Sequence, residues 1–136
     1  MKPWAVDTSV LIDVYLPDPV FAQASAECLA AHLADGLVIS PMTYVELAPA
    51  FDGDTRLQEQ FLSENGVEWL EPWTHADTEG AHRLWADYVK KKRAGQVGQG
   101  SKRPVADVFI EAFARRFQGL ITRNPKHFPT VQVVVP

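Results

Sequence analysis

The sequence has a single cysteine among its 136 residues and no long hydrophobic run. One thiol, Cys28, excludes an intrachain disulfide framework and is typical of a protein kept in a reducing cytoplasm. The lack of a run of about 20 apolar residues argues against a membrane-spanning helix. The N-terminus has no basic segment followed by an apolar one, so we expect no secretory signal. These absences predict a cytoplasmic protein without a membrane association.

Basic residues are scarce in the first part of the chain. Residues 1–80 hold 14 acidic and two basic residues, for a net charge of −12, whereas residues 81–136 hold 11 basic and three acidic residues, for a net charge of +8. Six bases fall within one short segment: Lys90, Lys91, Lys92, Arg93, Lys102 and Arg103. The segment is either a solvated helix end and loop or an electrostatic footprint for a polyanion. The charge pattern alone leaves both interpretations open.

The apolar pattern predicts a single domain, residues 1–136, in which strands and helices alternate. Short apolar runs predict strands at 4–6, 37–39, 67–70, 120–122 and 131–135. Capping residues, prolines and glycines predict helices between them, among them one opened by Asp18 and Pro19, one opened by Ser40 and Pro41, one from Thr74 to about Arg93, and one from Pro104 to Gly119. Units of this kind predict an α/β fold with a mostly parallel sheet covered on both faces, a three-layer α/β/α domain.

Four polar residues lie at or soon after predicted strand ends. Asp7 follows the first strand, Glu46 lies in the second turn of the helix after the second strand, Asp107 lies one turn into a later helix, and Asn124 follows the strand that ends at Thr122. Because the carboxyl ends of parallel strands meet at one edge of the sheet, we expect these four side chains to share a pocket. A single aspartate in such a place is usually a helix cap, but four in register favour metal chemistry.

Carboxylates crowded into one pocket repel one another and raise one another's pKa values. A hard divalent cation would relieve that repulsion, and oxygen ligands suit Mg²⁺ or Mn²⁺ rather than zinc. Such ions activate water and stabilise charge that develops on a phosphodiester. The four positions therefore predict a metal-dependent hydrolase of phosphodiester bonds.

Four segments of the sequence together resemble the PIN-domain nucleases, and within them the VapC-type toxins of bacterial toxin–antitoxin pairs. The segments are residues 6–13 (VDTSVLID), 39–47 (ISPMTYVEL), 106–110 (ADVFI) and 120–128 (LITRNPKHF). The resemblance spans residues 4 to 130. It implies a PIN-like fold, Mg²⁺- or Mn²⁺-dependent endoribonuclease activity on tRNA or rRNA, a homodimer, and inhibition by a cognate VapB-type antitoxin.

The resemblance also assigns roles to individual residues. Asp7, Glu46 and Asp107 match the acidic metal ligands of the family, and Asn124 falls where many members have a fourth aspartate. Its neutral amide leaves open whether one or two metal ions bind. Small polar side chains match positions beside the acids, where we expect hydrogen bonds to ligands or water: Thr8, Ser9 and Thr122. For Ser9, a helix cap and a direct catalytic contribution both stay open.

The leading hypothesis is an endoribonuclease in which the basic segment from Lys90 to Arg103, together with Arg123, attracts the RNA backbone. Three more residues are weaker candidates. Glu111 shares a helix face with Asp107 and is an additional acid. His127 follows a strand end and could approach the groove, but a structural hydrogen bond to its loop is the favoured interpretation. We expect Asp13 to face away from the site.

Two other functions stay open. The neutral Asn124 is consistent with a PIN-like module that binds RNA or protein without cutting. A phosphatase of the haloacid-dehalogenase type would use Asp7 as its nucleophile, but it would need a second aspartate where this chain has Ser9. We rank the phosphatase last.

Overall fold

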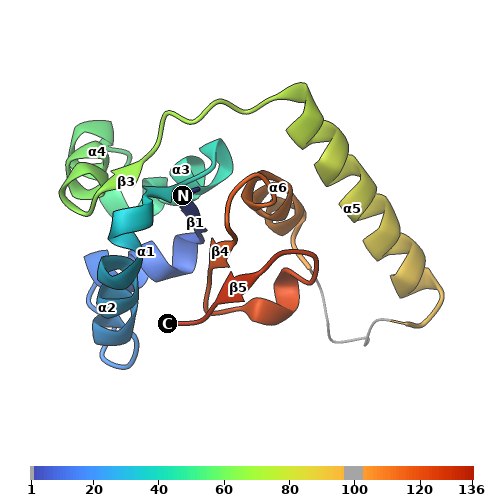
Figure 1. Cartoon of the computed structure of the whole chain (residues 1–136), viewed down its shortest axis with the longest axis horizontal. Helices are drawn as coiled ribbons and strands as arrows, with labels where there is room; N and C mark the ends of the chain where they lie inside the picture. Colours follow the sequence, from blue (N-terminus) through green and yellow to red (C-terminus); the bar gives the residue numbers. More distant parts are fainter. Residues whose placement is uncertain (1, 97–102) are drawn as a thin grey trace.

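The structure is a computed structural model that describes residues 2–96 and 103–136 (Figure 1). Its strands are β1 (Trp4–Val6), β2 (Leu37–Val38), β3 (Val67–Glu68), β4 (Leu120–Ile121) and β5 (Val133–Val134). Its α-helices are α1 (Thr8–Tyr15), α2 (Ala22–His32), α3 (Pro41–Glu46), α4 (Thr55–Glu64), α5 (His75–Arg93) and α6 (Val105–Ala114). Short 3₁₀ turns are η1 (Leu33–Asp35), η2 (Ala48–Phe51) and η3 (Pro125–His127). Across the described ranges, no helix is both long and apolar enough to cross a membrane.

All five strands of the sheet run parallel, in the order β3-β2-β1-β4-β5. In the β1–β4 pair, Val6 lies opposite Ile121. The residues that follow these two, Asp7 and Thr122, therefore leave the sheet side by side at its carboxyl edge. The backbone N–H of Asp7 donates to the carbonyl of Ile121 at 2.9 Å, which fixes this register as far as the first site residue.

Successive residues of β1 point to opposite faces of the sheet, as the two-residue repeat of a strand requires. Trp4 and Val6 pack in one cluster with side chains of α1, α2 and α4. Ala5 packs in a second cluster with side chains of α6. Helices α1, α2 and α4 therefore cover one face of the sheet and α6 covers the other, which confirms the predicted three-layer α/β/α fold (Figure 1).

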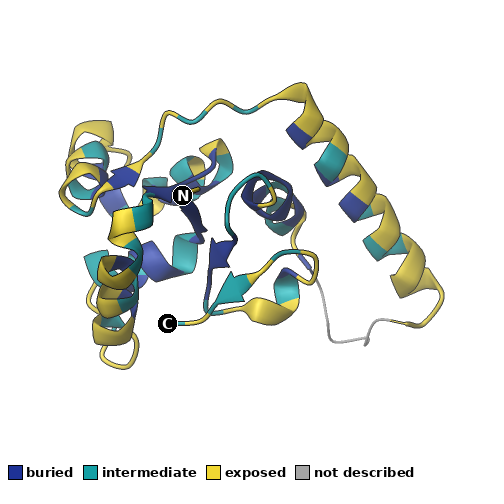
Figure 2. Cartoon of the chain, in the orientation of Figure 1, coloured by how far each residue is buried: buried dark blue, intermediate teal, exposed yellow. Residues whose placement is uncertain are grey.

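Helix α5 forms an outer layer against α6. Ala81 and Leu84 of α5 pack on Val108 and Ala112 of α6. The buried residues of α5 lie on the side that faces the rest of the molecule, and the remainder of the helix is largely exposed (Figure 2).

Two predicted helix starts have the expected capping bonds. The Thr43 N–H donates to Ser40 Oγ at 3.0 Å at the start of α3. At the start of α5, the side chains of Thr74 and Asp77 each accept from the backbone N–H of the other, at 3.3 and 2.9 Å. This reciprocal pair satisfies two backbone donors that the helix leaves open at its first turn.

Two predicted helix boundaries are wrong. Helix α2 begins at Ala22 and not at Pro19, because Asp18 Oδ1 accepts from the N–H groups of Val20 and Phe21 and closes a separate turn before the helix. Helix α6 ends at Ala114, well before Gly119. Gly119 instead packs against β5, where a Cβ atom would lie 2.3 Å from the carbonyl oxygen of Gln132. The glycine is required by this close approach and not by the helix end.

Candidate active site

Asp7 lies at the centre of the carboxyl edge of the sheet, between the end of β1 and the start of α1. Its side chain is buried, with only 6% of the residue exposed. Oδ1 accepts from the Thr8 N–H at 2.8 Å, so the carboxylate caps α1. Oδ2 accepts from the Thr122 hydroxyl at 2.8 Å, across the β1–β4 pair. Both carboxylate oxygens are held in fixed positions by the strand ends.

The environment of Asp7 favours its protonated form. Burial, aided by the negative charges of Asp107 and Glu46, raises the pKa of Asp7 to about 6 against the opposing hydrogen bonds from Thr122 and Thr8. Three acids from three different elements therefore act on one another across a single edge of the sheet. This is the convergence that the strand-end positions predict.

Glu46, the last residue of α3, is tied to α1 by a hydrogen bond. The Thr8 hydroxyl donates to Glu46 Oε1 at 2.6 Å. Thr8 thus joins two of the acids, since its backbone N–H binds Asp7 while its side chain binds Glu46. The hydroxyls of Thr8 and Thr122 both contact acids, as the sequence predicts.

Asp107, in the first turn of α6, is paired with His127 of η3. The imidazole Nδ1 lies 2.8 Å from Asp107 Oδ2. Burial raises the pKa of Asp107, while the His127 contact and the charge of Arg103 oppose that rise and Glu111 adds to it. Of the two interpretations of His127, the favoured hydrogen bond to its own loop is not the contact seen: the 3₁₀ turn places the imidazole against an acid from another element. The sequence signal is its position on the turn directly after Asn124.

Ser9 and Asn124 contribute less to the site than the three acids do. Ser9 is not the helix cap, because Asp7 fills that place, and its buried Oγ has no hydrogen-bond partner in the part of the chain that the structure describes. Asn124 is exposed, and its backbone N–H donates to Thr122 Oγ1 at 3.0 Å. No hydrogen bond joins its side-chain amide to an acid among the residues described here.

Two arginines predicted to attract RNA are occupied inside the protein. Arg103, which is 8% exposed, donates from Nη2 to the fully buried Glu111 at 2.6 Å. Arg123 donates to the buried Asp13 at 2.9 Å, and its guanidinium lies 4.1 Å from the ring centre of Phe21. Each guanidinium neutralises a carboxylate that would otherwise be buried as an unpaired charge. Both arginines therefore form internal ion pairs that the sequence did not predict.

The two acids of these pairs also have structural roles. Glu111 additionally accepts from the Thr130 N–H at 2.8 Å, so it is not an open additional ligand. Asp13 is buried against Arg123, and its Oδ2 also accepts from the Ser25 hydroxyl at 3.1 Å. These pairs fix α6 and the segment after β4 relative to the rest of the fold.

The remaining basic residues of the predicted RNA-binding segment lie at the end of α5. The exposed side chains are those of Lys90, Lys91, Lys92 and Arg93. Lys102 lies outside the described residues. The amine of Lys92 is 6.0 Å from the ring centre of Tyr88. The end of α5 therefore carries a cluster of solvated positive charges.

The donor set at the sheet edge suits a hard cation, although the site is not closed around one. Within residues 2–96 and 103–136, no three acid, histidine or cysteine side chains lie close enough together to form a complete metal-binding group. Thr8 holds one oxygen of Glu46 and His127 one oxygen of Asp107. All three acids are oxygen donors whose mutual repulsion a cation would relieve. The chemistry of these donors is the kind that Mg²⁺ and Mn²⁺ prefer, but the described residues do not arrange them as a complete binding group.

Comparison with solved structures finds this fold in two bacterial complexes. A chain of VapBC2 from Rickettsia felis, in a complex bound to a DNA fragment from its promoter, superposes with a TM-score of 0.68 at 16% identity, covering 97% of each chain. A chain of VapBC-1 from nontypeable Haemophilus influenzae superposes with a TM-score of 0.67 at 22% identity, covering 97% of this chain and 96% of that one. No protein-family model and no curated protein sequence matches the chain. At these identities the likeness shows the fold: this chain has the PIN-like α/β/α fold in common with these VapBC chains.

Proposed function

We propose that the protein is a Mg²⁺- or Mn²⁺-dependent endoribonuclease and the toxin of a type II toxin–antitoxin pair. The observation that carries the proposal is the convergence of Asp7, Glu46 and Asp107, whose charges act together on the buried Asp7. The fold shared with chains of two VapBC complexes supports it. The cytoplasm is the expected compartment, and tRNA or rRNA is the expected substrate class.

In this proposal, Asp7, Glu46 and Asp107 hold the cation. The cation supplies Lewis-acid activation of water and neutralises charge on the phosphodiester. Thr8 and Thr122 orient Glu46 and Asp7 through the hydroxyl bonds described above. His127, with its side chain 43% exposed, both fixes Asp107 and reaches solvent, so it is placed to exchange a proton with a bound substrate.

The exposed basic side chains at the end of α5 attract the RNA backbone in this proposal. The partner is a VapB-type antitoxin, and the chain forms a homodimer. Exposed apolar side chains of Val45 and Leu70, which line a groove with Tyr44 and Trp69, are the surface that dimerisation would bury. The oligomeric state is measured by light scattering coupled to gel filtration, with Leu70→Glu as the variant expected to be a monomer.

The activity is tested by incubating the purified protein with total RNA and mapping the cut ends, with and without a chelator. We expect cleavage with Mg²⁺ or Mn²⁺, none with chelator, and none in Asp7→Asn. Asp54→Asn is the matched control, because Asp54 also caps a helix through its carboxylate but lies on the exposed α4. Equal cleavage by wild type and Asp7→Asn, after removal of contaminating nuclease, would contradict the proposal.

A further inference from the structure

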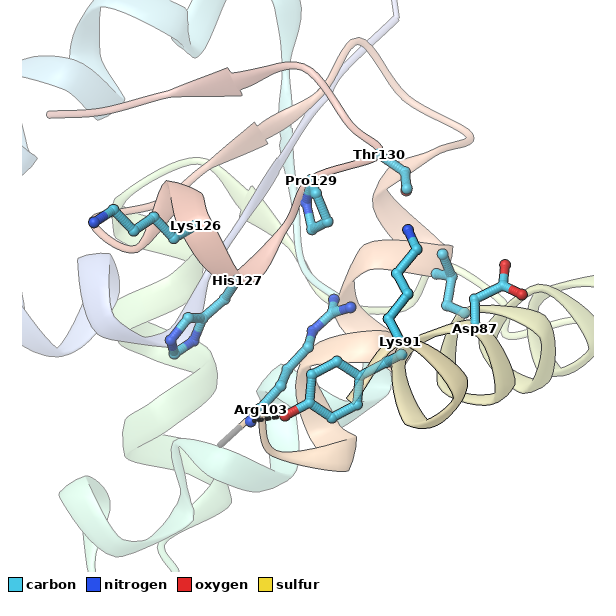
Figure 3. Close-up of a pocket in the computed structure, with 9 residues that line it drawn as sticks. Asp87, Lys91, Arg103, Lys126, His127, Pro129 and Thr130 are labelled. Carbon is cyan, nitrogen blue, oxygen red and sulfur yellow. Dashed lines mark hydrogen bonds between the residues drawn. The ribbon is translucent and has the colours of Figure 1, made fainter. Parts of the chain in front are cut away.

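A cavity of about 180 Å³ lies beside the candidate active site, between the second half of α5 and the segment that follows η3 (Figure 3). We call it the α5 pocket. His127 lines it, and the same imidazole contacts Asp107. The pocket is therefore joined to the acids through one shared side chain, although none of the three acids lines it.

The charges around the α5 pocket are mostly positive. Among the described residues, three bases and one acid line it: Lys91, Lys126, Arg103 and Asp87. In Figure 3 the Lys91 amine lies toward Pro129 and Thr130, whereas the Lys126 amine and the Asp87 carboxylate both point away from the other pocket residues. Arg103 is more than nine-tenths buried, and its side chain extends between His127 and Lys91. The pocket is thus suited to a ligand with negative charge.

Arg103 also has unused hydrogen-bonding capacity. Its Nη2 binds Glu111, but its buried Nε has no partner in the residues that the structure describes. A buried guanidinium nitrogen without a partner costs free energy unless a ligand or water meets the group. The unpartnered Nε of Arg103 therefore points to a ligand at the pocket independently of the surface lysines.

Much of the lining of the α5 pocket is apolar. Leu84, Tyr88 and Pro129 contribute apolar atoms to it, and the Tyr88 hydroxyl accepts from the backbone N–H of Arg103 at 2.9 Å. Drug-sized ligands usually occupy at least about 300 Å³, so this cavity suits one flat group and not a larger molecule. Flat apolar walls beside phosphate-binding amines are the features with which proteins hold an unstacked base and its backbone.

We propose that the α5 pocket binds one nucleotide of the RNA substrate, with its base against the apolar walls and its phosphate toward Lys91. The inference rests on the proposed nuclease function and adds a subsite next to the acids. An acidic peptide would match the charges of the pocket, but a carboxylate side chain has no flat apolar group to fill it.

The test uses uridine and adenosine 5′-monophosphates as probes, with chelator present, and follows backbone amide shifts by NMR. We expect saturable shifts at Lys126 and Thr130, and weaker binding of both inorganic phosphate and the uncharged nucleosides. Lys91→Gln should weaken mononucleotide binding about tenfold, the effect of losing one charged hydrogen bond. The matched control, Arg83→Gln, removes one positive charge from an exposed site on α5 that lies outside the pocket and should leave binding unchanged.

A second variant, Thr130→Trp, fills the pocket from an exposed position, and its fold is checked by its thermal midpoint. It should abolish binding of both mononucleotides. Equal binding by Lys91→Gln and Arg83→Gln, or binding of phosphate as tight as that of the mononucleotides, would overturn the proposal. Saturable binding of a glutamate-rich peptide without any binding of mononucleotide would overturn it in favour of an acidic protein partner.

The experiment separates the pocket from the nuclease. Asp7→Asn should bind the mononucleotides like wild type, because Asp7 does not line the pocket. Mononucleotide binding by a wild-type protein that cleaves no RNA would support the pocket and reject the nuclease. Metal-dependent cleavage with no mononucleotide binding would reject the pocket and leave the nuclease in place.

Discussion

The imidazole Nδ1 of His127 lies 2.8 Å from Oδ2 of Asp107, although the two residues belong to different elements. The contact joins α6 to η3 at the edge of the sheet where the acids meet. Burial raises the pKa of Asp107, and His127 opposes that rise. His127 therefore counteracts part of the rise in the pKa of Asp107 and fixes the orientation of its carboxylate.

We predict that His127→Ala weakens metal affinity, cleavage activity or both by about 10–100-fold, the usual effect of losing a group that orients a metal ligand. The measurement is the cleavage rate as a function of Mg²⁺ concentration. His82→Ala is the control, since His82 is exposed on α5 and lies away from the acids. An unchanged metal dependence in His127→Ala would show that the contact has no role in the site.

The buried Asp7 should make the protein less stable at neutral pH than at mildly acidic pH. The pKa of Asp7 is about 6 in the folded protein and 3.8 in the unfolded chain. Between these two pH values the carboxyl group of Asp7 is therefore protonated in the folded protein and ionised in the unfolded chain. The free energy of unfolding therefore falls as pH rises from about 4 to 6, by on the order of 3 kcal/mol from this group. Asp7→Asn lacks this titration and should be about 1–3 kcal/mol more stable than wild type at pH 7. Urea unfolding at several pH values measures both effects.

The control for that series is Asp54→Asn, whose carboxylate caps α4 in an exposed place. Its stability should follow that of wild type within about 0.5 kcal/mol at every pH. A lower stability of Asp7→Asn at pH 7 would mean that the hydrogen bonds of the carboxylate to Thr8 and Thr122 outweigh its burial.

Addition of Mg²⁺ or Mn²⁺ at millimolar concentration should raise the thermal midpoint of wild type, because a ligand that binds only the folded state stabilises it. A gain of about 1–3 kcal/mol corresponds to a concentration well above the dissociation constant. Asp107→Asn should lose most of the gain. A wild-type midpoint that does not move with either metal would favour the PIN-like module that binds without cutting.

The Arg103–Glu111 pair should be necessary for the fold. Arg103→Leu leaves Glu111, which is 0% exposed, without its cation, and we expect a loss of about 3–5 kcal/mol in the free energy of unfolding. Adding Glu111→Leu to that variant should recover most of the loss, because both charges are then gone. Arg83→Leu on the exposed face of α5 is the control. If the double variant is as unstable as Arg103→Leu alone, the loss in the free energy of unfolding comes from packing and not from the unpaired charge.

The sequence predicts the fold and the three acids because both depend on local patterns. Apolar runs and capping residues locate the strand ends, and parallel strands bring those ends to one edge, so Asp7, Glu46 and Asp107 follow from position alone. The three-layer α/β/α architecture follows from the same alternation, and the ends of some helices and strands were misplaced.

The partners of the charged residues could not be predicted in the same way. Arg123 meets Asp13 across 110 positions of sequence, and His127 meets Asp107 across 20. The choice of partner for each charged side chain depends on how elements distant in sequence pack together. No rule based on residue spacing predicts that choice. The sequence therefore does not distinguish an arginine that neutralises a buried acid from an arginine that is free to bind RNA.

The hydrogen bond between Thr122 and Asp7 joins positions 115 residues apart. During synthesis, the first strand leaves the ribosome long before the fourth, and Asp7 gains neither its threonine donor nor its neighbouring strand until that later segment emerges. The edge of the sheet that carries Asp7 is consequently completed only after most of the chain has been made, and a chain that stops short of Thr122 lacks it.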